Sequence, residues 1–330
     1  MNRMTKIVLL LCLGLVFALA CRALSQPESV PQSLESTPTI INPTNILSPT
    51  PVSPTEPPII STLPVQPAIS TPALSIPTST SSEKGGQVDA RPQAVILVAE
   101  DDVLNIRKQP GVQAEILGEL AYNATGIALT GAERMVGDQR WVEIRTSGGT
   151  GWVNANFLTE YKPPTEFCTD PQVKILIEKF KAAVLNRDGN SMAALASPVH
   201  GLNVNYFHTG NRVHYSPAEA GSLFESQVPV NWGIQPASGM EVTATFPDEV
   251  LPKLDEVLNS ATESGCNDPA MGPNNYIFQW PDDYKNINFV SLAKPGSPGV
   301  ELDWRTWLVG VEYVDGKPYL FALLQLFWEP

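Results

Sequence analysis

Short apolar runs alternate with polar turns between Val95 and Leu158. Most of the turns contain Asp, Gly, Pro or Ser, the residues that β-turns favour. The apolar runs lie at Val95–Val98, Val103–Ile106, Glu115–Leu120, Gly126–Leu129, Trp141–Thr146 and Gly151–Leu158. Strands this short and this often interrupted are typical of a sandwich or a barrel. We therefore predict a small all-β domain over residues 91–161.

A different pattern follows Lys162-Pro163-Pro164. Asp170-Pro171 is a helix start, and the apolar residues after it recur at helical spacing. We expect shorter helices at Met192–Ala196, Ser216–Phe224 and Asp248–Ser260, and strands at Leu202–Phe207, Val213–Tyr215, Met240–Phe246, Tyr276–Trp280, Ile287–Leu292, Trp304–Tyr313 and Tyr319–Trp328. Helices early and strands late predict an α+β domain over residues 162–330, with the apolar run Tyr319–Phe327 central in its sheet.

The first 21 residues have the pattern of an export signal, with Arg3 and Lys6 before the apolar run Ile7–Ala20. Two kinds of signal peptidase could cut between Ala20 and Cys21. A lipoprotein-type peptidase would cut before Cys21 and leave it lipidated with acyl chains such as palmitate, whereas an ordinary peptidase would recognise Ala18-Leu19-Ala20. We favour lipidation, because Cys21 would otherwise be an unpaired exported thiol.

Residues 22–90 read as a linker rich in Pro, Ser and Thr. The stretch from Pro27 to Pro77 holds 13 of the 31 prolines of the chain. Such a composition buries too little apolar surface to fold and favours extended polyproline II. We expect a disordered spacer between the membrane anchor and the folded part.

Charge and cysteine content narrow the class of protein. The formal net charge is -13, from 34 acidic and 21 basic residues, which argues against nucleic acid as a partner. Cys12 lies in the signal and Cys21 is the lipidation candidate, so Cys168 and Cys266 are left as a pair. In an exported chain we expect them to form a disulfide, worth about 4 kcal/mol in the chain-entropy model. A cysteine nucleophile or a metal pair is the alternative.

The β-domain resembles the bacterial SH3 (SH3b) family. The matching segments are Leu104–Arg107, Pro110-Gly111, Leu117–Leu120, Trp141–Ile144, Gly148–Val153 and Phe157-Leu158. The resemblance implies an SH3-like barrel that binds wall peptide or a protein partner. It departs from the family pattern at Ala121–Thr125, where a glycine commonly precedes the third strand. The order of elements after residue 162 is only loosely similar to NTF2-like, cone-shaped domains.

Candidate chemistry is sparse. His200, His208 and His214 fall in one segment and would suit a transition metal if they converged. Asp282 and Asp283 would suit a glycosidase pair, but they follow Trp280-Pro281 and read as a turn. We expect no catalytic residue, metal or cofactor. The candidate ligand-binding residues are Trp232, expected to be exposed, and Tyr206 and Trp307.

Three functions are open. The first is a non-enzymatic lipoprotein that is held by its lipid anchor on the outer face of the bacterial cytoplasmic membrane, or secreted if Cys21 is not lipidated. Its SH3b module would bind peptidoglycan or a surface protein. The second is a wall or glycan hydrolase that the module targets. The third is a small-ligand sensor whose cavity is lined by Tyr206, Trp307 and Phe321.

Overall fold

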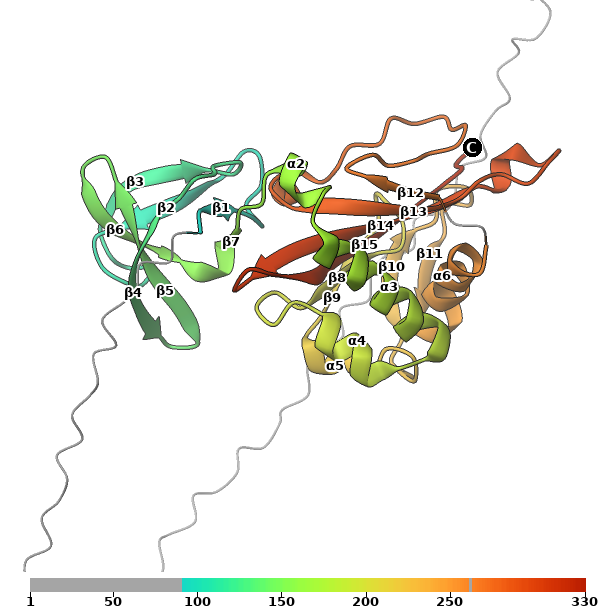
Figure 1. The fold of residues 1–330 in the computed structure, drawn as a ribbon, viewed down its shortest axis with the longest axis horizontal. Helices are drawn as coiled ribbons and strands as arrows, with labels where there is room; N and C mark the ends of the chain where they lie inside the picture. Colours follow the sequence, from blue (N-terminus) through green and yellow to red (C-terminus); the bar gives the residue numbers. More distant parts are fainter. Residues whose placement is uncertain (1–90, 261–262) are drawn as a thin grey trace, which may run out of the picture. The chain divides into compact units, whose positions relative to one another are not determined.

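The computed structural model describes residues 91–260 and 263–330 (Figure 1). The signal-peptide, lipidation and linker predictions therefore lie outside the described residues. All the described residues belong to one compact unit. Within them, no helix is both long enough and apolar enough to cross a membrane.

The region up to Glu160 is all-β, as predicted, and we call it the module. Its five-stranded sheet has the order β3-β2-β6-β5-β4. The strands are β2 (Val103–Arg107), β3 (Ile116–Ala121), β4 (Leu129–Val136), β5 (Gln139–Thr146) and β6 (Gly149–Asn154). Strand β1 (Gln93–Val95) pairs separately with β7 (Leu158–Glu160), after the short 3-10 turn at Ala155–Phe157. The alternation in β2 points Leu104 and Ile106 into the core.

The expected closed barrel is not formed. Strands β3 and β4 are the two edges of the five-stranded sheet, and neither pairs with the other. Closure fails because β1 and β7 pair with each other rather than extending the ladder of either edge. The module is an open sheet and a two-stranded ribbon that enclose one apolar core.

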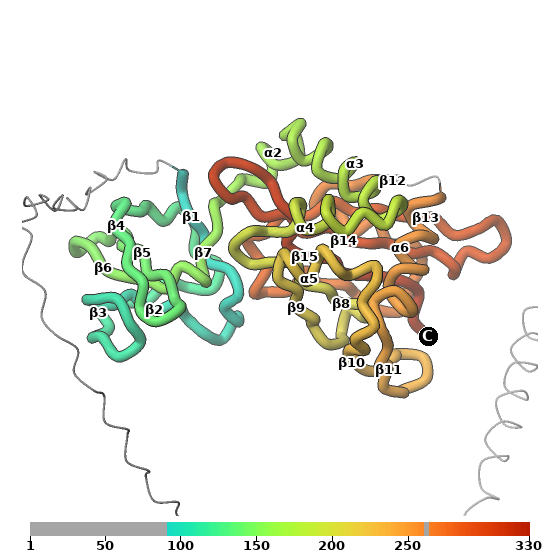
Figure 2. The backbone as a smooth tube through the Cα atoms, turned by 90° about the horizontal axis from the view of Figure 1, so that it is seen from below, coloured from blue at the N-terminus to red at the C-terminus, as the bar shows by residue number. Residues whose placement is uncertain are grey.

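The C-terminal region, residues 162–330, is built on a six-stranded sheet of order β12-β13-β14-β15-β8-β9. The strands are β8 (Leu202–Asn205), β9 (Arg212–Tyr215), β12 (Glu263–Cys266), β13 (Asn288–Lys294), β14 (Arg305–Val314) and β15 (Lys317–Phe327). Strand β15 is central, as predicted, and pairs in parallel with β8. A separate ribbon is formed by β10 (Val230–Ile234) and β11 (Glu241–Ala244) (Figure 2).

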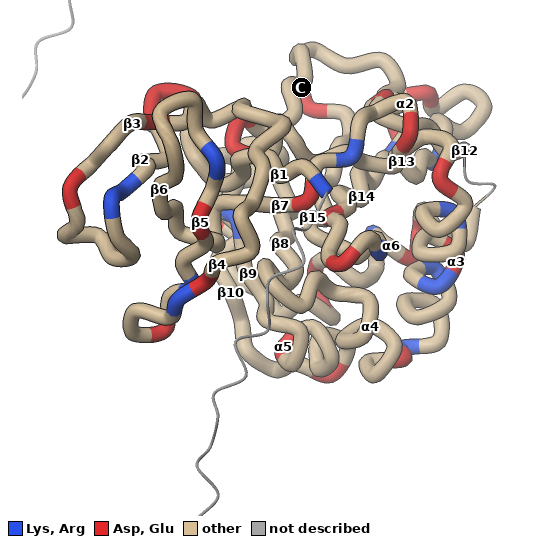
Figure 3. Tube along the Cα trace, turned by 60° about the vertical axis from the view of Figure 1, so that its left-hand side comes forward, with Lys and Arg blue, Asp and Glu red and all other residues tan. Residues whose placement is uncertain are grey.

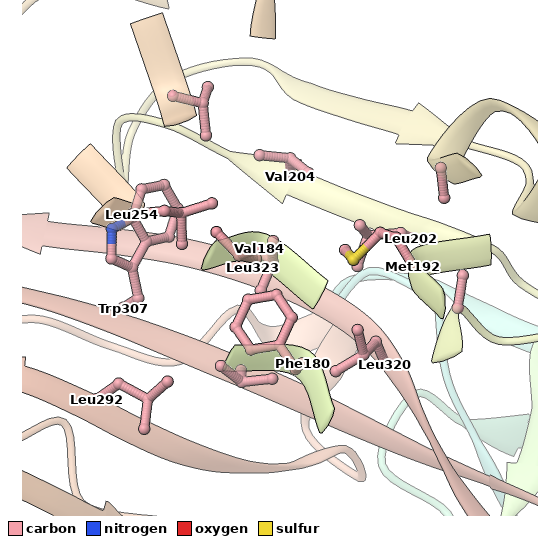
Figure 4. Packing of buried hydrophobic residues seen from close by; sticks show 14 of the residues in the cluster. Phe180, Val184, Met192, Leu202, Val204, Leu254, Leu292, Trp307, Leu320 and Leu323 are labelled. Carbon is pink, nitrogen blue, oxygen red and sulfur yellow. The ribbon is translucent and has the colours of Figure 1, made fainter. Parts of the chain in front are cut away.

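Helices cover one face of this sheet. They are α2 (Pro164–Phe167), α3 (Pro171–Asn186), α4 (Gly189–Leu195), α5 (Pro217–Gly221) and α6 (Leu251–Leu258), the last preceded by a π-turn at Phe246–Val250. Asp170 caps α3, and Ser216 with Glu219 forms the predicted capping box of α5. Phe180 and Val184 of α3 pack with Leu323 of β15 in the main core (Figure 4).

The opposite face of the sheet is covered by loops. Phe289, Leu308 and Leu324 pack there against Phe278 and Trp280. The predicted strand at Tyr276–Trp280 is wrong, because this segment has no ladder partner and serves as an apolar cover. Strand β15 turns side chains to both faces, and a bulge opposite Gly310-Val311 shifts its alternation at Phe321.

The module and the C-terminal region share a small apolar cluster. Ile96 packs with Tyr284, Ile287, Phe321 and Ala322, all buried. The amide of Asn286 donates to the Val95 carbonyl at 2.8 Å, and the Leu97 N–H donates to the Asp283 carbonyl at 2.7 Å. The two regions are thus joined by buried contacts as well as by the chain.

Candidate functional site

A groove opens in the module where two neighbouring strands separate. Strand β2 pairs with β3 along its whole length but meets β6 through the single pair Arg107–Trp152. The two strands therefore diverge towards Val103. A cavity of about 230 Å³ lies there, lined by Leu97, Val98, Asp102, Val103, Leu104, Asn105, Arg107, Val112, Trp141, Asn154 and Phe157. We call it the β2 groove.

Trp141 lines the groove and carries a buried hydrogen-bond donor. The residue lies on β5 opposite Asn154 and is 3% exposed. Its indole Nε1 is buried and has no acceptor among the described residues. A buried donor without a partner costs about 1–3 kcal/mol, and native structures seldom keep one without a reason. A ligand carbonyl or carboxylate in the groove is a chemical reason for this one.

Two opposite charges stand at the ends of β2. Asp102 is exposed and accepts a hydrogen bond from the Val103 N–H at 2.7 Å. Arg107 is half-buried, and its Nη1 donates to the Ala114 carbonyl at 2.8 Å. Within the described residues neither group has an ion-pair partner within 4.0 Å, whereas the next residue, Lys108, pairs with Glu115. The backbone bonds hold both charges in place without neutralising them.

Elsewhere in the module, some opposite charges form ion pairs. Acidic and basic residues are interspersed on neighbouring strands such as β4 and β5, where Arg140 pairs with Glu133 (Figure 3). At the Arg107 end, the groove is bordered by Val112, which is 58% exposed. The β2 groove thus has at each end a charged residue without an ion pair among the described residues, and an exposed apolar residue, Val112, at its border.

The predicted ligand-binding residues of the C-terminal region are core residues. Trp232, Tyr206 and Trp307 are at most 4% exposed, and none lines a described cavity. The expectation that Trp232 is exposed is wrong, because β10 and β11 pair around it and its Nε1 donates to the Ala244 carbonyl. Burial, and then the nearby Glu249, raise the pKa of the Tyr206 hydroxyl.

The three histidines do not converge. His208 contacts Glu329 at 2.9 Å, and His214 lies 3.4 Å from the Asn203 side chain. His200 is buried, and its Nδ1 lies 2.6 Å from Glu312 Oε1. Across the described part of the chain, no cluster of three His, Cys, Asp or Glu residues is suited to a metal ion.

The cluster around His200 has residue types seen in serine hydrolases but a different arrangement. The Ser197 hydroxyl donates to the Glu312 carboxylate at 2.5 Å, not to the imidazole. The other ring nitrogen, Nε2, lies 3.1 Å from the Asn156 carbonyl oxygen. A catalytic imidazole needs one nitrogen on the nucleophile, so this arrangement does not activate Ser197. The cluster instead links the C-terminal region to the module.

The acidic pair Asp282 and Asp283 lies in a 3-10 turn, in agreement with the predicted turn. Both residues line a wide cavity of about 700 Å³ together with Glu100 and Asp101. Asp283 is held by both terminal nitrogens of Arg212, at 2.6 and 3.0 Å. A carboxylate bound in this way is already neutralised, which disfavours a role as a general acid.

Cys168 and Cys266 form a disulfide with a Cα–Cα distance of 5.7 Å. It joins the end of α2 to the edge strand β12, across 98 positions of sequence. This pairing uses both thiols, so the alternative of a cysteine nucleophile does not apply to the oxidised protein.

Residues 102–159 match the family model for the bacterial SH3 domain. The match begins at Asp102 and spans strands β2 to β6, so it includes both charged ends and the buried indole of the β2 groove. No curated protein and no solved structure matched the chain. The loose similarity of the C-terminal region to NTF2-like domains stays a prediction.

Proposed function

We propose that this chain is a non-enzymatic binding protein of the bacterial cell surface and that the β2 groove holds peptide from the cell wall. The match to the bacterial SH3 domain supports wall binding in general terms. The observation that carries the proposal for this groove is the buried Trp141 N–H, which has no acceptor within residues 91–260 and 263–330. A bound peptide carbonyl would supply that acceptor.

The test is retention of the full-length chain, in mild detergent, on purified peptidoglycan sacculi. Trp141→Phe keeps an aromatic ring in the core but removes the donor, and we expect it to weaken retention about five- to tenfold. The matched control is Trp152→Phe, because Trp152 is half-buried on β6 and does not line the groove. Equal retention of both variants and the wild type would place the wall contact elsewhere.

Release of soluble muropeptides is assayed in the same tubes. Retention without release supports a binding protein. Release of muropeptides by the wild-type chain would favour the alternative of a targeted hydrolase and contradict the proposal of a non-enzymatic protein. Failure of the wild type to bind sacculi would contradict wall binding and direct the search to protein partners.

We also propose that the chain is anchored through acylated Cys21, which lies outside the described residues. The support is the sequence pattern around Ala20-Cys21. The test is metabolic labelling with a palmitate analogue, followed by cell fractionation. Cys21→Ser should abolish labelling and release the chain from the membrane fraction. An unlabelled wild type would instead indicate cleavage after Ala20 by an ordinary signal peptidase.

A further inference from the structure

We infer that the β2 groove selects a short zwitterionic peptide, with its amine at the Asp102 end and its carboxylate at the Arg107 end. This inference rests on the proposed function and adds the ligand's length, charge and direction. It follows from two charges at the ends of β2 that have no ion-pair partner among the described residues, and from the buried indole N–H of Trp141 on β5, which has no acceptor among them.

The charges of the groove are complementary to such a ligand. The backbone fixes Asp102 through the Val103 N–H and Arg107 through the Ala114 carbonyl. Both side chains keep further hydrogen-bonding atoms, and no ion pair joins them to another described residue. A guanidinium fork suits a carboxylate, and a carboxylate suits an ammonium group. A ligand with one charge of each sign would neutralise both ends at once.

The spacing of the charges sets the length of the peptide. Asp102 and Arg107 are five positions apart on an extended strand, which separates their Cα atoms by about 16 Å. Both residues line the β2 groove, and an extended peptide spans about 3.5 Å per residue. The ligand is therefore about three to five residues long. An internal segment of a folded protein has no free backbone amine and carboxylate this close together, so it is excluded as the ligand.

Trp141 supplies the contact between the two ends. It lines the same groove, and its buried Nε1–H requires an acceptor that the described residues do not provide. An extended peptide offers backbone carbonyls at regular intervals. The proposed ligand therefore supplies an acceptor for the indole N–H and a counter-charge for both Asp102 and Arg107. A simple anion could bind the indole N–H and Arg107, but it would leave Asp102 without a counter-charge.

The experiment uses the full-length chain and tetra-alanine as the probe, with N-acetylated and C-amidated tetra-alanine for comparison. Binding is followed by the NMR resonance of the Trp141 indole N–H, which is assigned by its loss in Trp141→Phe. We expect tetra-alanine to shift this resonance and each blocked peptide to bind about fivefold or more weakly.

Single variants test the direction of binding. Asp102→Asn should weaken tetra-alanine but not its N-acetylated form, and Arg107→Gln should weaken tetra-alanine but not its C-amidated form. Asp102→Asn keeps the acceptor for the Val103 N–H, so the strand end is preserved. The matched controls are Asp138→Asn and Arg145→Gln, which remove the same charges from exposed positions outside the groove.

The outcomes separate this inference from the proposed function. If sacculi retention depends on Trp141 but blocked and free peptides bind alike, the zwitterion inference is wrong and wall binding stands. If Asp102→Asn is insensitive to C-amidation and Arg107→Gln is insensitive to N-acetylation, the peptide binds in the opposite direction and the proposed direction is wrong. If neither sacculi nor tetra-alanine binds the wild-type chain, both proposals fail.

Discussion

Buried tryptophans before and after residue 162 differ in whether their indole N–H has a hydrogen-bond acceptor. In the C-terminal region, Trp232, Trp280, Trp304 and Trp307 each donate their indole N–H to a backbone carbonyl. In the module, Trp141 is as buried as Trp232, Trp304 and Trp307, but its N–H has no acceptor among the described residues. The difference indicates that burial alone does not mark a binding residue. An unsatisfied polar atom beside a groove is the more informative sign.

The largest expected effect is the loss of a satisfied indole. Trp307 is fully buried between the sheet and α6, and its N–H donates to the Lys253 carbonyl at 3.1 Å. Trp307→Ala should lower the free energy of unfolding by about 3–5 kcal/mol, since it leaves a large cavity. Urea denaturation measures the loss, with Ile277→Ala at a 91% exposed position as the control. A loss below about 1 kcal/mol would mean that Trp307 is not a core residue.

The second-largest expected effect concerns the disulfide of the C-terminal region. Replacing Cys168 and Cys266 together by serine should cost about 2–4 kcal/mol, because the unfolded chain regains the freedom of a long loop. Urea denaturation of the oxidised wild type and the double variant gives the difference. Adding reductant to the wild type should reproduce the same loss. If the double variant is as stable as the oxidised protein, the bridge does not support the fold.

A matched pair of substitutions tests the contrast between indoles directly. Trp307→Phe removes a hydrogen bond to the Lys253 carbonyl, whereas Trp141→Phe removes a donor that had no acceptor among the described residues. We expect Trp307→Phe to be more destabilising by about 1–3 kcal/mol. The same urea experiment applies to both variants. Equal losses would indicate that Trp141 has an acceptor in solution, such as water, and would weaken the argument for the groove.

Local signals predicted much of the fold. Asp170-Pro171 and Ser216-Pro217 mark helix starts because a cap satisfies the first free amides, whatever the rest of the chain does. Asp315-Gly316 joins β14 and β15 with both residues at positive φ, as a tight hairpin requires. The central position of β15 followed from apolar residues on both of its faces.

Non-local pairing accounts for what the sequence could not predict. The stretch around Trp232 is rich in Asn, Gly and Pro and reads as a loop, yet β11 pairs with it across a bulge at Trp232. The β2 groove likewise depends on where β2 leaves β6, which no local pattern records. In the sequence, Asp102 is only a polar residue between two apolar runs, and Arg107 is only the last residue of the Leu104–Arg107 segment. Their placement at the two ends of one groove came from the structure.

The smallest expected effect concerns a carboxylate whose partners are in place, in contrast to Asp102. Hydrogen bonds from the Ser297 hydroxyl and N–H, with help from Lys294, lower the pKa of Asp303 to about 2. A carboxyl whose pKa is lower in the folded than in the unfolded protein stabilises the fold above the unfolded pKa of about 4. This contribution is lost as the pH falls from about 4 towards 2. The melting temperatures of the wild type and Asp303→Asn should therefore differ slightly at pH 5 and converge at pH 2, with Asp138→Asn as the control. A gap that stays constant over this range would mean that the Ser297 and Lys294 contacts do not favour the ionised form.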